Sequence, residues 1–302
     1  MRIGVMIGTH KDRRGLDSLV EQARDLDARG FATVWLPQVF GLDAVTTAAV
    51  LGRETARIEI GTAVVPTQPR HPSALAQQAL TAGVACGGRF TLGIGLSHPV
   101  VIERILGLSY ARRAAHMREY LEVLGPLLGE RSVHHEGEEF RVDLDLELPD
   151  ARPVPVVVAA LGERMLELAG RLATGTILWM TGPRTIESHI APRVRAAARE
   201  AGRPEPRIVA GVNIALTTNP APILERLAKR MGIYRTLPSY RAMLEREGDV
   251  HPVDLALIGD EEVLDAGLAR LQDAGVSDFE TVVVHGEEGA EERTLAYLES
   301  RL

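Results

Sequence analysis

Small residues that join an apolar segment directly to a helical pattern are the clearest chemical signal in this sequence. Residues 156–162 read Val-Val-Val-Ala-Ala-Leu-Gly, and an amphipathic segment starts immediately afterwards. Backbone N–H groups at such a turn, with a helix N-terminus behind them, form an anion site suited to phosphate. Ala160, Leu161 and Gly162 are therefore candidate phosphate-binding residues. An ordinary tight turn between a strand and a helix fits the same spacing equally well.

A second segment of low bulk occurs at residues 93–97, which read Gly-Ile-Gly-Leu-Ser. A flat ring could lie against the backbone there, next to Gly95 and Ser97. The segment is not a dinucleotide fingerprint, because that motif needs a third glycine and an acidic residue roughly 20 positions further on. Glycine at a strand end can also serve packing alone, so both interpretations stay open.

Polar side chains also follow the ends of several expected strands. His10, Gln38 and His98 occupy such positions. A histidine there could donate a proton to a substrate, although a lone histidine more often has a structural hydrogen bond. Trp179 ends another expected strand.

Motifs for several other enzyme classes are missing from the sequence. No Gly-x-Ser-x-Gly elbow, P-loop or His-Glu-x-x-His motif occurs, so hydrolase, kinase and metalloprotease functions lack support. His134 and His135 are adjacent but have no matching carboxylate–histidine pair, and we expect no metal site.

The elements that must position these residues alternate between short apolar segments and longer amphipathic segments, as in repeated βα units. The expected strands are 2–7, 31–36, 58–65, 90–94, 154–159, 176–180, 208–216 and 279–284. The expected helices are 16–29, 44–56, 74–85, 114–128, 164–172, 186–201, a long and mostly helical stretch over 222–274, and 291–302. A hairpin is expected over 132–142.

Eight strands with intervening helices predict an α/β fold of the (β/α)8 TIM-barrel type. An open, doubly wound sheet is the alternative, because periodicity does not reveal closure. We expect one domain over 1–302, with insertions at about 131–142 and 230–255. In such barrels the active site lies at the C-terminal ends of the strands.

The composition limits which classes of partner and which cellular compartment we expect. The 302 residues carry a net charge of −7 with acids and bases intermixed, so we expect no nucleic-acid partner. No apolar run reaches the roughly 18 residues of a spanning helix, and no signal peptide is visible, so we expect no membrane association. The single cysteine, Cys86, suits a reducing cytoplasm.

Taken together, several segments resemble the luciferase-like monooxygenase superfamily, and more closely its F420-dependent oxidoreductase branch. They occur in the family's order over nearly the whole chain. The segments that carry the resemblance are residues 31–37 (FATVWLP), 60–66 (IGTAVVP), 70–72 (RHP), 87–95 (GGRFTLGIG), 118–121 (REYL), 154–170, 175–181 and 258–263 (IGDEEV).

The resemblance implies a luciferase-like barrel with insertions and a cofactor pocket. The deazaflavin ring would lie over the end of the third strand, where the family often has a non-proline cis peptide, here at Ala63–Val64. The turn at 160–162 would hold the phosphate. The implied cofactor-binding residues are Ala63, Val64, Val65, Gly95, Ser97, Ala160, Leu161, Gly162 and Trp179.

The sequence departs from the family at catalytic positions. Many relatives have Asp-His after the second strand, where this chain has Gln38 and Val39. Valine cannot transfer a proton, so that histidine's role does not carry over. Gln38 could still hydrogen-bond a substrate carbonyl or a ring edge. A glutamate that some relatives have after the fourth strand is replaced by Leu96.

The implied function is an F420-dependent oxidoreductase that transfers a hydride between C5 of the deazaflavin and an unsaturated or carbonyl small molecule. The proton would come from His98, Tyr234 or water. One alternative is an FMN-dependent luciferase-like monooxygenase. Another is a non-catalytic flavin- or deazaflavin-binding protein, which the missing Asp-His motivates. The resemblance also favours a homodimer.

Overall fold

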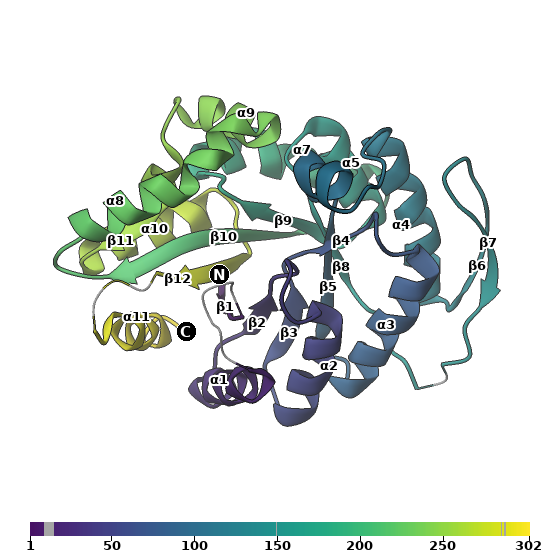
Figure 1. Cartoon of the computed structure of the whole chain (residues 1–302), viewed down its shortest axis with the longest axis horizontal. Helices are drawn as coiled ribbons and strands as arrows, with labels where there is room; N and C mark the ends of the chain where they lie inside the picture. Colours follow the sequence, from purple (N-terminus) through teal and green to yellow (C-terminus); the bar gives the residue numbers. More distant parts are fainter. Residues whose placement is uncertain (9–14, 149, 285, 287) are drawn as a thin grey trace.

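The computed structural model describes residues 1–302 except 9–14, 149, 285 and 287. Within these described residues, eight parallel strands form a closed barrel, because β12 pairs with both β1 and β10 (Figure 1). The barrel is therefore the expected (β/α)8 type and not an open sheet. Its strands, in spatial order, are β1 (Arg2–Met6), β2 (Thr33–Leu36), β3 (Glu59–Thr62), β5 (Phe90–Gly95), β8 (Val156–Ala159), β9 (Gly175–Trp179), β10 (Arg207–Leu216) and β12 (Asp278–Val283).

Two short strands extend the sheet. β4 (Val65–Pro66) follows β3 and pairs with β5, whereas β11 (Leu257–Gly259) pairs with the end of β10. β11 lies inside the stretch 222–274, which is mostly helical as expected, and it is the one element of that stretch that the sequence pattern did not indicate. Three residues are too few to show a strand periodicity. The expected hairpin is confirmed as β6 (Ser132–Glu136) and β7 (Arg141–Asp145).

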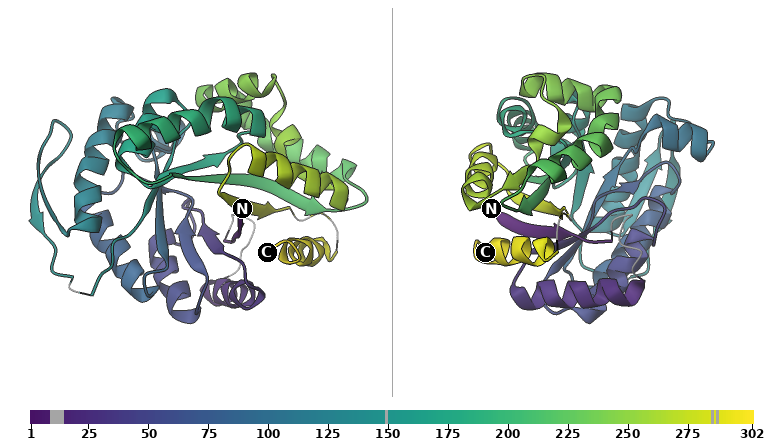
Figure 2. Two further views of the ribbon diagram at one scale, coloured as in Figure 1. Left: turned by 180° about the vertical axis from the view of Figure 1, so that it is seen from behind. Right: turned by 60° about the vertical axis from the view of Figure 1, so that its left-hand side comes forward.

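Helices surround the barrel in the βα order that the sequence predicts (Figures 1 and 2). The helix expected over 186–201 consists of a π-helical turn η2 (Ile186–Ile190) followed by α7, and a short α6 (Pro183–Thr185) precedes it. The main helices are α1 (Leu16–Arg29), α2 (Ala44–Glu54), α3 (Pro72–Ala85), α4 (Arg113–Gly129), α5 (Glu163–Leu172), α7 (Ala191–Glu200), α8 (Ala221–Met231), α10 (Glu261–Asp273) and α11 (Ala290–Glu299). None of the described helices is long and apolar enough to cross a membrane.

The segment between α8 and α10 lies outside the repeating βα pattern. It contains η3 (Gly232–Thr236), α9 (Pro238–Glu247) and η4 (Pro252–Leu255). Its apolar side chains pack with the end of β9 and with α8 in a cluster separate from the main core. That cluster includes Met180, Ala215, Ile223, Leu227, Met231, Ile258 and Val284, with Trp179, Tyr234 and Tyr240 against it.

An ion cluster fills the N-terminal end of the barrel. Arg2 lies 2.7 Å from Glu59 and 3.1 Å from Asp278, and Arg207 lies 2.9 Å from Glu59 and 2.6 Å from Asp278. Burial opposes ionisation of Glu59, but Arg207 and Arg2 outweigh it and hold the pKa of Glu59 below its usual value. The two cations and two carboxylates thus compensate one another in a partly buried site.

Above this cluster, the ring of Trp35 fills the middle of the barrel. Trp35 is fully buried, and glycines on the neighbouring strands make room for it. A Cβ atom on Gly4 would lie 2.8 Å from Trp35 Nε1, and one on Gly61 would also overlap the ring. Within the described part of the chain, the barrel interior therefore has space for a ligand in its C-terminal half.

Removing one cation of the ion cluster should destabilise the fold, because it leaves Glu59 and Asp278 with a single counter-charge. For Arg207→Met we expect a loss of roughly 2–3 kcal/mol in the free energy of unfolding, measured by urea titration at pH 7. Arg171→Met is the control, since Arg171 is exposed and lies 3.8 Å from the exposed Glu200. Equal stabilities of the two variants would show that the cluster contributes nothing to the fold.

Candidate active site

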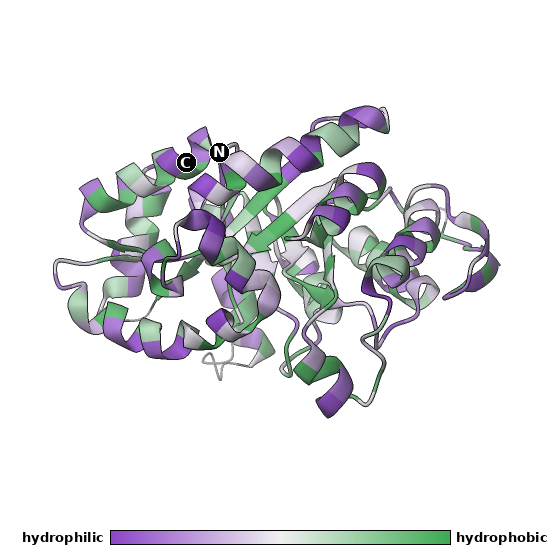
Figure 3. Cartoon of the chain, turned by 90° about the horizontal axis from the view of Figure 1, so that it is seen from above, coloured by the Kyte–Doolittle hydropathy of each residue, from purple (hydrophilic) through white to green (hydrophobic). Residues whose placement is uncertain are grey.

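A cavity of about 1650 Å³ opens at the C-terminal ends of the strands, where active sites of this fold occur. Seen from above, the central strands are largely apolar and the surrounding helices have mixed faces (Figure 3). The cavity walls come from the ends of the strands, from the N-terminus of α5, and from α8, η3 and α9. Among the expected site residues, Ala63, Val64, Gly95, Ser97, His98, Ala160, Leu161, Gly162 and Trp179 line it.

One side of the cavity is the backbone between β3 and β4. The peptide bond Ala63–Val64 is cis, at the position that the family resemblance implied. Gly95 on β5 lies against it: a Cβ atom there would be 2.8 Å from Val64 Cγ2 and 3.0 Å from Ala159 Cβ. Glycine is thus required for this close approach. Val65 is fully buried and pairs with Ile94, so it supports the cavity wall but does not line the cavity.

The turn before α5 has the geometry of an anion site. Gly162 is the N-cap of α5 in an extended conformation, and no side chain caps the helix. The Leu161 carbonyl accepts a hydrogen bond from His189 Nε2 at 2.8 Å. Because a trans peptide directs its N–H opposite to its C=O, this bond directs the Gly162 N–H away from His189. Because no described side chain caps α5, its first-turn N–H groups are available to an anion.

His189 is a residue of this turn that sequence reasoning missed. It is buried, and burial lowers its pKa, so the imidazole is neutral at pH 7. Since the Leu161 carbonyl can only accept, Nε2 must carry the proton. His189 lies in the π-helical turn η2, a feature that periodicity does not reveal.

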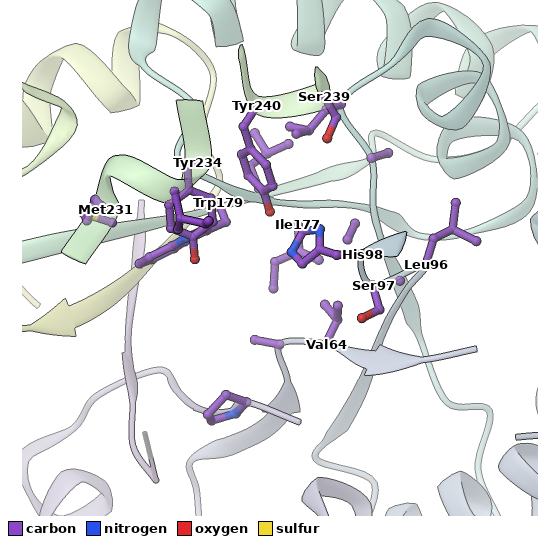
Figure 4. A pocket seen from close by; sticks show the side chains of 18 of the residues that line it. Val64, Leu96, Ser97, His98, Ile177, Trp179, Met231, Tyr234, Ser239 and Tyr240 are labelled. Carbon is purple, nitrogen blue, oxygen red and sulfur yellow. The ribbon is translucent and has the colours of Figure 1, made fainter. Parts of the chain in front are cut away.

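An aromatic wall faces the cis peptide across the cavity (Figure 4). The ring centroids of Trp179 and Tyr234 are 6.4 Å apart, those of Tyr234 and Tyr240 are 4.9 Å apart, and those of Tyr240 and His98 are 5.8 Å apart. Burial raises the pKa of Tyr240 and lowers that of His98. At neutral pH both side chains are uncharged, so each can donate a hydrogen bond into the cavity.

Comparison with known proteins agrees with this geometry. The luciferase-like monooxygenase family model matches residues 1–292. The chain belongs to this family.

Similar sequences have names that refer to the cofactor F420. A putative coenzyme F420-dependent oxidoreductase of Mycobacterium tuberculosis, Rv3520c, is 30% identical over 200 residues, which are 61% of this chain and 57% of the relative. An F420-dependent glucose-6-phosphate dehydrogenase of Kineococcus radiotolerans is 29% identical over 265 residues, 83% of this chain and 73% of the relative. The match thus spans somewhat more than half the length of the first of these relatives.

Solved structures of the same fold include proteins of both cofactor types. The coenzyme F420-dependent tetrahydromethanopterin reductase of Methanopyrus kandleri has a TM-score of 0.81 at 19% identity and covers 100% of this chain and 98% of its own. A type II Baeyer–Villiger monooxygenase from Pseudomonas putida, solved with FMN, has a TM-score of 0.75 at 16% identity and covers 99% and 95%. At these identities the likeness shows the fold alone.

Within this luciferase-like barrel, the other candidate polar residues lie elsewhere. Gln38 Oε1 accepts a hydrogen bond of 2.7 Å from the N–H of Ala44 at the start of α2, and Gln38 does not line the cavity. The amide oxygen of Gln38 is thus occupied by the hydrogen bond that caps α2. A catalytic role for Gln38 stays a prediction. His10 lies outside the described residues.

Glu280 and Asn213 also line the luciferase-like cavity, and sequence reasoning missed both. Each is 2% exposed. Burial raises the pKa of Glu280 to about 8, so its carboxyl group holds a proton at neutral pH. For Glu280, the sequence did contain a signal: a carboxylate occurs within the apolar strand expected over 279–284. The strand pairing places this residue on the side that faces the barrel interior.

The raised pKa of Glu280 predicts a pH-dependent stability. The unfolded carboxyl releases its proton near pH 4.5 and the folded carboxyl only near pH 8, so the folded state loses stability as pH rises between these values. The slope is about 1.4 kcal/mol per pH unit. Glu280→Gln lacks this titration, and its stability relative to the wild type should rise by roughly 3 kcal/mol from pH 5 to pH 7.5.

Urea unfolding at several pH values measures this difference. The exposed Glu167→Gln is the control and should follow the wild type. A constant difference between Glu280→Gln and the wild type over this range would mean that the carboxyl ionises normally.

Proposed function

We propose that this protein is an F420-dependent oxidoreductase that transfers a hydride between C5 of the deazaflavin and an unsaturated or carbonyl small molecule. The observation that carries the proposal is that one cavity contains both a slot and a turn with the geometry of an anion site. The slot lies between the backbone at Ala63–Val64 and the wall that begins at Trp179, and the anion site is the uncapped turn at Gly162. The F420-dependent relatives support this choice of cofactor.

The residues present fit such a cofactor. Gly95 has no side chain to obstruct a ring, and the free N–H groups of α5 suit a phosphate. Arg164, in the first turn of α5, also lines the cavity and adds positive charge. The cavity of about 1650 Å³ exceeds the 300–1,000 Å³ typical of ligand pockets, so it has room for a ring and a second molecule.

The bound deazaflavin would supply the hydride, and the protein would supply orientation and exclusion of water. Reduction of a carbonyl carbon places negative charge on the carbonyl oxygen, which then needs a hydrogen bond and a proton. His98 and Tyr240 are neutral neighbours at the cavity, with ring centroids 5.8 Å apart. We assign them to bind the substrate oxygen and to pass it a proton that is replaced from solvent.

Titration of the purified protein with F420 and with FMN tests the cofactor. We expect F420 to bind with a micromolar Kd, followed by quenching of tryptophan fluorescence, because Trp179 lies against the slot. Tight binding of FMN without binding of F420 would replace the proposal by an FMN-dependent monooxygenase. If F420 binds but reduced F420 is not oxidised by any of a panel of enones and carbonyl compounds, a binding-only role is favoured.

The anion turn has its own test in His189. His189→Leu removes the hydrogen bond that orients the Leu161–Gly162 peptide, so we expect the Kd of F420 to rise about tenfold. His189→Gln retains a donor and should bind within about twofold of the wild type. Equal Kd values for the Leu variant and the wild type would show that the turn does not depend on His189.

His98 can be tested through turnover. For His98→Phe we expect kcat to fall by roughly 10²-fold while the Kd of F420 stays unchanged, because the side chain is assigned to the substrate and not to the cofactor. His134→Phe, at an exposed histidine of the hairpin, is the matched control. An unchanged kcat in the His98 variant would assign the proton to another group.

A further inference from the structure

Three buried polar atoms in the barrel interior have no hydrogen-bond partner among the described residues. They are Glu280 Oε1, Asn213 Oδ1 and Trp35 Nε1. Buried polar groups are almost always hydrogen-bonded, so three unpartnered atoms in one interior point to a group that the protein itself does not provide. Two of the three residues, Glu280 and Asn213, line the cavity.

The strand register explains why Glu280 faces open space. Glu280 pairs with Gly4 on one side and with Gly211 on the other, and neither glycine has a side chain to cover the carboxyl group. A Cβ atom on Gly211 would lie 2.9 Å from Glu280 Oε2 and 2.9 Å from Trp179 Cε3. The carboxyl group therefore lies over Gly211, next to the aromatic wall.

Asn213 lies two residues beyond Gly211 on the same strand, β10. Its amide nitrogen is 3.5 Å from Met231 Sδ, which leaves the amide oxygen as an acceptor without a donor. Glu280 and Asn213 thus form a polar floor (the name used below for these two side chains) beneath a cavity whose walls combine apolar and aromatic side chains with basic ones such as Arg164 and Arg230.

The chemistry of the polar floor selects its ligand. A protonated carboxyl group donates one hydrogen bond and accepts another, and the Asn213 oxygen accepts one. A complementary ligand group has an oxygen acceptor beside an N–H or O–H donor. Neither side chain is positively charged, so nothing in the floor compensates a phosphate or a carboxylate.

We propose that Glu280 and Asn213 bind an uncharged group that both accepts and donates hydrogen bonds, such as a hydroxyl group or a lactam edge, of a molecule in this cavity. The inference deepens the proposed function and rests on it only in taking this cavity as the redox site. The group can belong to the edge of the deazaflavin ring or to the substrate, and the two sources share this chemistry.

Two variants separate hydrogen bonding from shape. Glu280→Met has a similar length without hydrogen-bonding groups, and Glu280→Gln retains a donor and an acceptor. Asn213→Leu tests the second floor residue if Glu280→Met does not fold. Glu167→Gln, at an exposed position on α5, controls for loss of a carboxylate elsewhere. Melting temperatures confirm that each variant compared is folded.

The first arm measures the Kd of F420 alone by fluorescence. The second arm measures binding of δ-valerolactam by saturation-transfer NMR, to F420-loaded and to unloaded protein, with N-methyl-δ-valerolactam as an acceptor-only control. We expect Glu280→Met or Asn213→Leu to weaken one of these ligands about fivefold to tenfold, and Glu280→Gln to remain within about twofold of the wild type.

The measurement in which binding changes shows whether the bound group belongs to the deazaflavin or to the substrate. A higher Kd for F420 assigns the polar floor to the ring edge, whereas selective loss of the lactam on the loaded protein assigns it to the substrate. Unchanged binding in both arms overturns the inference and leaves a floor hydrated by water only. If the wild type does not bind F420, the proposed function fails, and lactam binding to the unloaded protein still decides the inference on the floor.

Discussion

Closure of the barrel through β12 is the constraint on which the rest of the structure depends. The pairing of β12 with β1 and β10 brings Asp278 beside Arg2 and Arg207, residues that are far apart in the sequence. The resulting ion cluster and the ring of Trp35 fill the lower part of the barrel. As far as the described residues show, the interior is consequently open at the end where the C-termini of the strands meet.

Much of this architecture can be predicted from sequence because it depends on local patterns. The eight barrel strands are apolar segments separated by helical periodicity, and the turn at 160–162 shows in its small residues. The position of the cis peptide at Ala63–Val64 followed from the family resemblance, since no local pattern of residues indicates it. β11 was not predictable, because a strand of three residues has no measurable period.

The chemistry of the cavity was less predictable, because it depends on register and on neighbours from other strands. Glu280 has no hydrogen-bond partner in the described part of the chain, since its two neighbours across the sheet are glycines, which only the strand pairing reveals. Gln38 follows a strand end as an active-site residue would, yet its amide oxygen caps α2. Glu280 lines the cavity and Gln38 does not because their side chains point in different directions, which residue type alone does not reveal.

The aromatic wall has a different structural origin from the opposite side of the cavity. Tyr234 and Tyr240 come from the segment between α8 and α10, whose apolar residues form their own cluster, whereas Val64 and Gly95 belong to the barrel. A substitution in that outer segment can therefore change one side of the cavity without disturbing strand pairing. The barrel and this part of the cavity lining are built from separate segments, so the shape of the cavity can be altered while the fold persists.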